Sequence, residues 1–279
     1  MNGYQVRLIQ FLHPGGEHRP LANGWKPWTT SGEHRRTFVE QPGSHIASLG
    51  ENPISAILHF WCEWECEAEL ICRFPPPKLD GYPRHLFRPY IQARSSYSAV
   101  SNTDPFVFGD RFRYCVCQQP SRPSLRQLAR GSVILFGSHL RGSFVLDTVF
   151  VVASRQSYYR NKIQLLAVPE TYRLAALEPL VEGCGEGEEL AYYEGATTDE
   201  PVEGMFSFFP CRTADKSSGY PRPSVTLNDV INPALKQGLK SHGPVTMTQA
   251  SALWRAVAKQ VLKSGLHLGT SAELPSHLP

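Results

Sequence analysis

The chain has 279 residues, of which 41% are hydrophobic and 19% charged, a composition typical of a folded globular protein and too apolar for a disordered one. No apolar run approaches the roughly eighteen residues that a membrane helix needs, and the start of the chain lacks the apolar core and cleavage site of a signal peptide. We therefore expect a cytoplasmic protein without membrane contact, in which the seven cysteines are reduced thiols.

The formal net charge is only +3, but it is distributed unevenly along the chain. Residues 174–203 hold nine Asp and Glu residues and no Lys or Arg, which leaves a net charge of +12 on the remainder. Arginine outnumbers lysine in the first 130 residues, and its planar guanidinium suits bidentate contacts with phosphate. We predict a polyanionic partner, while arginines that merely solvate the surface would give the same composition.

The expected elements indicate an α+β fold, with a β-rich mixed sheet core and a helical C-terminal end. YQVRLIQFL (4–12) is typical of an opening strand, and residues 131–153 indicate two strands joined by a Gly-rich turn. TMTQASALWRAVAKQVLKSG (246–265) predicts a helix with Thr248 as a candidate N-cap. We accordingly divide the chain into a β-rich nucleic-acid-processing core (1–173), an acidic insert (174–203) and a helical part packed on the core (204–279).

ILHFWCEWECEAELI (57–71) alternates strictly and predicts one half-buried strand with Trp61 and four glutamates on one face. Neighbouring carboxylates repel one another unless arginines lie opposite or part of the row borders a site. A solvated strand face is the simpler explanation, and Glu63 is the member that we select as a candidate. The cysteines on the other face lack zinc-knuckle spacing, which favours buried thiols and no metal.

Gly-Glu-His-Arg occurs twice, at 16–19 and 32–35, within an irregular segment that also holds Trp25. The spacing is too short for a structural repeat, whose units usually run about twenty to fifty residues. Histidine beside a carboxylate can transfer protons, bind a metal or make ordinary hydrogen bonds. The repetition favours a single polar site over loop packing, and a metal bound through His18 and His34 is the weaker alternative.

NTDPFVFGDRF (102–112) contains two tight polar turns around an apolar Phe-Val-Phe stretch. The proline after Asp104 keeps that residue out of the α region, so its carboxylate projects from a fixed backbone. In the following apolar strand, Asp147 would need a partner if it were ionised, and we expect a buried structural carboxylate there.

Several enzyme classes are excluded by absent motifs. The chain has no phosphate-binding Gly-x4-Gly-Lys-Ser/Thr loop, no Gly-x-Ser-x-Gly nucleophile turn and no zinc deaminase signature. What remains is a surface rich in arginine, aromatic residues and loop carboxylates, which suits stacking of a base and binding of phosphates.

The stretches FLHPGGEH, GEHRRTF, NTDPFVFGDRF and GSVILFGS…FVLDTVFVV resemble a bacterial family associated with nucleotide modification and phage defence. The resemblance covers about residues 8–152 and is most distinctive at NTDPFVFGD. Within that setting the chain is similar to DNA glycosylases that excise glucosylated hydroxymethylcytosine from phage DNA. The resemblance implies a DNA-directed antiviral role and carries no functional residue over to this chain.

We therefore predict a DNA glycosylase without cofactor that acts, as a monomer, on a modified base flipped out of double-stranded phage DNA. Such a reaction needs a carboxylate that stabilises an oxocarbenium-like sugar and orients water. The predicted catalytic residues are Asp104, Asn102 and, as the second carboxylate, Glu63. The predicted substrate-binding residues are Glu17, His18, Trp25, Glu33, His34, Arg35, Arg36, Trp61, Asp110, Arg111, Gln118 and Gln119. The alternatives are a non-catalytic reader of modified nucleic acid and a metal-dependent nuclease or nucleotide hydrolase.

Overall fold

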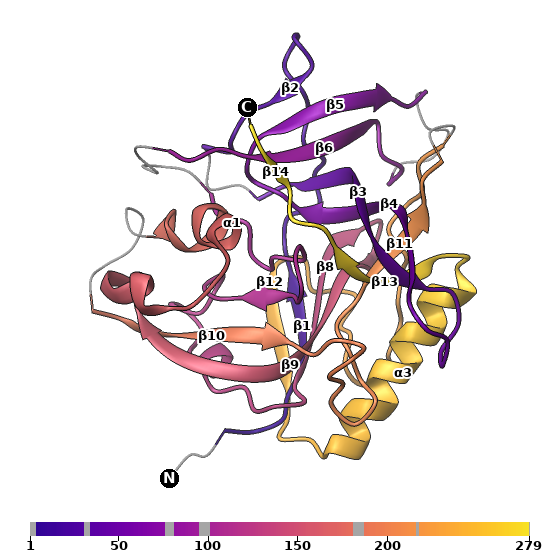
Figure 1. Ribbon diagram of the computed structural model, residues 1–279. Coiled ribbons are helices and arrows are strands. Elements are labelled where there is room, and N and C mark those ends of the chain that lie inside the picture. The colour runs from indigo at the N-terminus through magenta and orange to yellow at the C-terminus, as the bar shows by residue number, and fades with distance from the viewer. Residues whose placement is uncertain are drawn as a thin grey trace.

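The computed structural model describes residues 4–30, 34–75, 81–94, 101–180, 187–215 and 218–278. The chain is mostly β, with two mixed sheets (Figure 1). The described N- and C-terminal segments lie at opposite ends of the molecule, and the helix near the C-terminus runs along its outside (Figure 1).

The first sheet has six strands in the order β12-β1-β8-β9-β10-β7. Its strands are β1 (Leu8–Leu12), β7 (Arg113–Tyr114), β8 (Val133–Leu140), β9 (Ser143–Tyr159), β10 (Glu189–Gly195) and β12 (Gly238–His242). β1 runs parallel to β8, and every residue of β1 is buried. A continuous apolar run without alternation is what a strand covered on both faces requires. The two strands predicted within residues 131–153 are confirmed as β8 and β9.

The second sheet follows the order β13-β11-β4-β3-β6-β5-β2, with β14 attached to β6. Its strands are β2 (Trp25–Lys26), β3 (Arg36–Ile46), β4 (Ile54–Glu63), β5 (Ala68–Arg73), β6 (His85–Ile91), β11 (Phe209–Thr213), β13 (His267–Ala272) and β14 (Ser276–His277). Because β13 pairs with both β11 and β3, the strands β3, β4, β11 and β13 close into a small barrel. Closure removes the edge that an open sheet would expose there.

The one long helix among the described residues is α3 (Met247–Lys263). Its apolar residues recur at helical spacing and are buried: Ala250, Leu253, Trp254, Val257, Ala258 and Val261. The N-cap is Thr246 rather than the predicted Thr248, because Thr246 and Gln249 form a reciprocal capping box. Shorter helical turns are η1 (Pro123–Arg126), η2 (Arg160–Leu165), α1 (Glu170–Tyr172) and η3 (Arg173–Leu177).

The predicted helical C-terminal end is only partly right. Besides α3, residues 204–279 contribute β11, β12, β13 and β14, so most of the elements in this part are strands. The acidic segment likewise contains β10, which pairs with β9 and β7. Among the described residues, no helix is both long and apolar enough to cross a lipid bilayer.

The strand predicted for residues 57–71 is interrupted, and the interruption creates the candidate site. β4 ends at Glu63 and β5 begins at Ala68. Between them, buried side chains replace the partners that a sheet would supply: Thr37 donates its hydroxyl to the Trp64 carbonyl, and Lys26 donates to the Cys66 carbonyl. Because these backbone groups are satisfied away from the sheet, the chain can leave it without orphaned donors or acceptors.

Candidate functional site

The two Gly-Glu-His-Arg runs meet at one place in the fold. The first run pairs in parallel with Arg36, directly after the second run: Arg36 donates its N–H to the Gly16 carbonyl (2.7 Å), and His18 donates its N–H to the Arg36 carbonyl (3.0 Å). This pairing brings the imidazoles of His18 and His34 to the same carboxylate, that of Glu65.

Glu63 and Glu65, at the end of β4, are the centre of this arrangement. They are 2% and 0% exposed, so the expectation of a solvated glutamate face is wrong for these two residues. A buried carboxylate is costly unless it is paired. The partners of Glu63 and Glu65 therefore determine the net charge of the site and the protons that it holds.

Three side chains contact Glu63. His13 Nδ1 lies 2.7 Å from Oε2, His34 Nδ1 lies 2.8 Å from Oε1, and Arg36 donates from Nη1 to Oε2 (2.8 Å). Arg36 stands directly opposite Glu63 in the β3–β4 register, which explains why a glutamate is tolerated in this strand.

Glu65 is held by the two histidines of the repeated runs and by backbone contacts. His18 Nε2 lies 3.3 Å from Oε2, and His34 Nδ1 lies 3.4 Å from Oε1. The Arg35 N–H donates to Oε1 (3.3 Å), and the Glu65 N–H donates to the Thr103 hydroxyl (3.1 Å). We call His13, His18, His34, Arg36, Glu63 and Glu65 the His/Glu cluster.

Arg36 also connects the cluster to a second buried carboxylate, Asp147. Arg36 Nε lies 3.6 Å from Asp147 Oδ2, and Arg222 Nη1 lies 3.4 Å from Asp147 Oδ1. Arg222 further donates to the Ser138 hydroxyl (2.8 Å) and to the Gly15 carbonyl (2.8 Å). Asp147 therefore has the ionic partners that its apolar sequence context predicted.

The charges of the cluster set the protonation of its members. The negative charge of Glu63 raises the pKa of His34 to about 10, against the effect of burial. Burial alone would raise the pKa of Glu63, but the neighbouring histidines and Arg36 hold it well below its ordinary value. Burial lowers the pKa of His13 more than Glu63 raises it. At neutral pH, two cations, His34 and Arg36, therefore face an ionised Glu63.

A recess of about 260 Å³ lies next to the cluster. Arg35 and Arg222 connect the recess with the cluster: both line the recess, while the Arg35 backbone N–H donates to Glu65 and the Arg222 guanidinium contacts Asp147. We call this pocket the arginine recess; it is lined by Gly15, Gly16, Glu17, Arg19, Arg35, Trp61, Gly81, Tyr82, Arg84, Leu140 and Arg222. Arg222 packs over the Trp61 ring, 5.2 Å from its centroid. Four guanidinium groups against one carboxylate favour an anionic ligand.

Asp104 is buried beside the cluster and binds backbone N–H groups instead of facing the solvent. It is fully buried, and its oxygens accept the N–H groups of Cys115 (3.0 Å), Val116 (2.7 Å) and Cys117 (2.7 Å). Burial raises the pKa of Asp104 to about 7. Because both oxygens are enclosed, the predicted catalytic role of Asp104 is corrected to a structural one.

The rest of the NTDPFVFGD loop has a similar supporting role. Thr103 accepts the N–H of Glu65, as described above, and Asn102 donates from Nδ2 to the Ala176 carbonyl (3.3 Å). Cys117 Sγ, next to the N–H that Asp104 holds, lies 3.2 Å from His13 Nε2. The apolar Phe-Val-Phe stretch between the two turns is buried.

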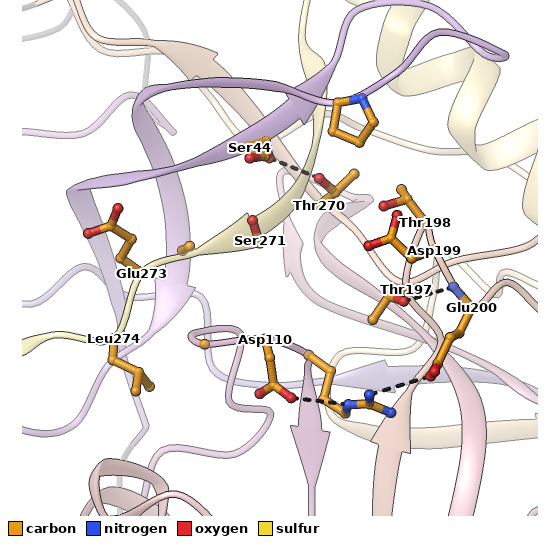
Figure 2. Close-up of a pocket in the computed structure, with 14 residues that line it drawn as sticks. Ser44, Asp110, Thr197, Thr198, Asp199, Glu200, Thr270, Ser271, Glu273 and Leu274 are labelled. Carbon is orange, nitrogen blue, oxygen red and sulfur yellow. Dashed lines mark hydrogen bonds and ion pairs between the residues drawn. The ribbon is translucent and has the colours of Figure 1, made fainter.

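Two predicted substrate-binding residues, Asp110 and Arg111, lie instead in a separate pocket of about 930 Å³ (Figure 2). Asp110 and Glu200 form ion pairs with Arg111. Figure 2 shows these two carboxylates below the hydroxyl groups of Thr197 and Thr270. The lining includes four carboxylates, those of Asp110, Asp199, Glu200 and Glu273, and Arg111 is its one basic residue. This excess of negative charge disfavours phosphate.

The remaining predicted residues make local contacts. Glu17 accepts the N–H groups of Arg84 and His85, and Trp25 stacks on Tyr90. Gln119 is buried and exchanges two hydrogen bonds with the backbone of Ala191 in β10. The exposed Gln118 contacts Ser121. Glu33 lies outside the described residues.

Sequence reasoning selected Glu63, His18, His34 and Arg36 but did not select Glu65, His13 or Arg222. The alternation that places Glu63 on one face also places Glu65 there, so that signal was present. His13 precedes the first Gly-Glu-His-Arg run by only a few residues. Arg222 carries no local signal, because it reaches the cluster through a contact across 75 residues of sequence.

Comparison of the chain with protein-family models, with curated proteins and with solved structures finds no match in any of the three. The resemblance to a phage-defence family therefore stays a prediction, and any function assigned to the chain rests on the geometry of the His/Glu cluster and the arginine recess.

Arg36→Met tests whether the cluster depends on charge pairing. The substitution leaves Glu63 and Asp147 without their shared guanidinium, and we expect the free energy of unfolding to fall by about 3–5 kcal/mol. Arg88→Met is the matched control, because Arg88 is half exposed and pairs with Glu40 and Glu69 at 3.5–3.8 Å; its loss should stay below about 1 kcal/mol. Urea denaturation measures both, and equal losses would contradict the assignment.

Asp104→Ala tests the structural role of that residue. Three N–H groups lose their acceptor, and we expect a loss of about 3 kcal/mol or more in the free energy of unfolding. Asp199→Ala, at an exposed position, should change stability by less than about 0.5 kcal/mol. A folded Asp104→Ala protein of undiminished thermal stability would show that the three N–H contacts contribute nothing.

Proposed function

We propose that this protein is a hydrolase that processes nucleic acid, with a phosphate of the substrate bound in the arginine recess beside the His/Glu cluster. The observation that carries the proposal is a chain of ionic contacts from the recess to the cluster. Arg222 lines the recess and contacts Asp147, and Arg36 contacts both Asp147 and Glu63. A concave anion-binding site next to buried groups of strongly shifted pKa is the arrangement expected of an active centre.

The recess suits one nucleotide unit better than an intact duplex. Its volume of about 260 Å³ lies just below the roughly 300–1,000 Å³ of pockets for drug-sized ligands. Arg19 and Arg84 are exposed at its wall and can contact a phosphate. The exposed Tyr82 ring offers aromatic surface for a base or sugar. The substrate would therefore be single-stranded or flipped out of the helix.

Two bonds of such a substrate are candidates for hydrolysis. The first is the N-glycosidic bond of glucosylated hydroxymethylcytosine in phage DNA, cleaved by a cytoplasmic monomer. Water then adds its oxygen to the sugar carbon, and the base leaves with a proton. Since Asp104 is enclosed, Glu63 is the carboxylate that this reaction would use.

The second candidate is a phosphoester bond, in which water adds its oxygen to phosphorus and the leaving oxygen takes up a proton. One observation favours it: Glu63 and Glu65 are at most 2% exposed, which leaves a sugar carbon no direct access to either carboxylate. Phosphate binding in the arginine recess is common to both reactions and does not distinguish them.

A product assay tests the proposal and separates the two bonds. DNA with cytosine, hydroxymethylcytosine or its glucosylated form is incubated with the full chain, and strand breaks are measured with and without alkali. Alkali-dependent breaks and a released base identify base excision, whereas alkali-independent breaks identify phosphoester cleavage. We expect Glu63→Gln to abolish the product and Glu40→Gln, at a buried glutamate paired with His59, to retain it. Binding without any product would leave a non-catalytic reader and overturn the hydrolase proposal.

Arg19→Ala and Arg84→Ala test the recess. If each guanidinium contacts a phosphate, each substitution should weaken binding for every sequence and reduce the slope of log affinity against log salt by about 1. Arg255→Ala, which removes an exposed charge on α3, serves as the control for net charge. Fluorescence anisotropy across a salt series measures the slopes, and a slope that changes equally in all three variants would argue against specific contacts.

A further inference from the structure

His34, Glu63 and Glu65 bring three potential metal ligands to one point of the His/Glu cluster. One ligand atom from each residue lies within 4.8 Å of the other two. The two glutamates project from the end of β4 and the segment after it, and His34 precedes β3. Adjacent antiparallel strands fix these positions through the pairing of Arg36 with Glu63.

The ligand atoms lack hydrogen-bond partners, although they are buried and close together. His34 Nδ1 lies 2.8 Å from Glu63 Oε1, yet neither atom has an aligned hydrogen bond within the described part of the chain. Glu65 Oε2 is likewise unsatisfied, and the side chains of Glu63 and Glu65 are 0% exposed. Buried polar atoms are nearly always hydrogen-bonded. A metal ion displaces the His34 proton when it binds, and Nδ1 and the two carboxylates then present lone pairs to one point, as the ligands of a cation do.

We propose that His34, Glu63 and Glu65 bind a divalent cation, Mn²⁺ or Zn²⁺. One imidazole nitrogen with two carboxylate oxygens suits these ions, and three protein ligands leave a coordination position open. His18 contacts Glu65 and His13 contacts Glu63, which orients the carboxylates as outer residues do around metal centres. The sequence analysis favoured no metal and named His18 and His34 as the weaker metal alternative; the structure instead groups His34 with Glu63 and Glu65.

The site extends the proposed function and rests on it in one respect. If the protein hydrolyses nucleic acid, a divalent cation next to the arginine recess favours the phosphoester bond over the N-glycosidic bond. Cation binding itself is measured without substrate, and phosphate binding in the recess is measured in EDTA. Failure of one proposal is therefore distinguishable from failure of the other.

The test is a Mn²⁺ titration of the full chain after dialysis against EDTA, with free Mn²⁺ measured by electron paramagnetic resonance. We expect one bound Mn²⁺ per chain, which Zn²⁺ displaces. His34→Gln and Glu65→Gln should each weaken binding by at least about tenfold. His59→Gln is the matched control, because it breaks another buried histidine–glutamate pair, His59 with Glu40 at 3.1 Å, and should leave binding unchanged.

Circular dichroism shows whether each variant folds. If His34→Gln and Glu65→Gln are unfolded, pulsed electron paramagnetic resonance on the wild-type protein decides, because a bound Mn²⁺ ligated by histidine shows coupling to nitrogen. A wild-type chain that binds no Mn²⁺, or binds it without nitrogen coupling, overturns the site. Folded variants that bind as tightly as the wild-type protein overturn it equally.

Discussion

The burial of two carboxylates, Glu63 and Glu65, is the constraint on which the rest of the arrangement depends. Removing an ionised carboxylate from water costs several kcal/mol even after the protein relaxes. The chain meets this cost with groups from separate parts of the sequence, among them His13, His34 and Arg36 around Glu63. Each of these partners is itself buried or nearly so, and the cluster therefore forms as a whole or not at all.

The two most distinctive stretches of the sequence both lie near these carboxylates, one in direct contact with them and the other in contact with the residues around them. The repeated Gly-Glu-His-Arg runs supply two of the three imidazoles that contact them, those of His18 and His34, and His13 supplies the third. The NTDPFVFGD loop lies one layer further out: Thr103 holds the backbone of Glu65, and Asp104 holds the backbone of Cys117, whose sulfur contacts His13. A loop rich in polar residues thus stabilises the site without reaching a ligand.

Local periodicity predicted several of the strands and the long helix, but it did not predict the interruption between β4 and β5. β8, β9 and α3 follow from apolar runs and helical spacing, which are local properties. The interruption after Glu63 could not be predicted in the same way, because the groups that satisfy it, such as Thr37 in β3 and Lys26 in β2, are distant in sequence. An enclosed Asp104 was also unpredictable, because a fixed backbone position does not reveal whether water or backbone N–H groups surround the carboxylate.

Closure of the barrel by β13 and the position of Arg222 have a consequence for the order in which the protein matures. β3 and β4 are synthesised early, yet β13 pairs with β3 only when residues 267–272 are available, and Asp147 gains Arg222 only late in translation. A nascent chain still attached to the ribosome near residue 200 holds the glutamates and histidines but lacks the last cation and the closing strand. The centre is thus completed only after Arg222 and the strand at residues 267–272 have been synthesised, well after the glutamates and histidines that they enclose.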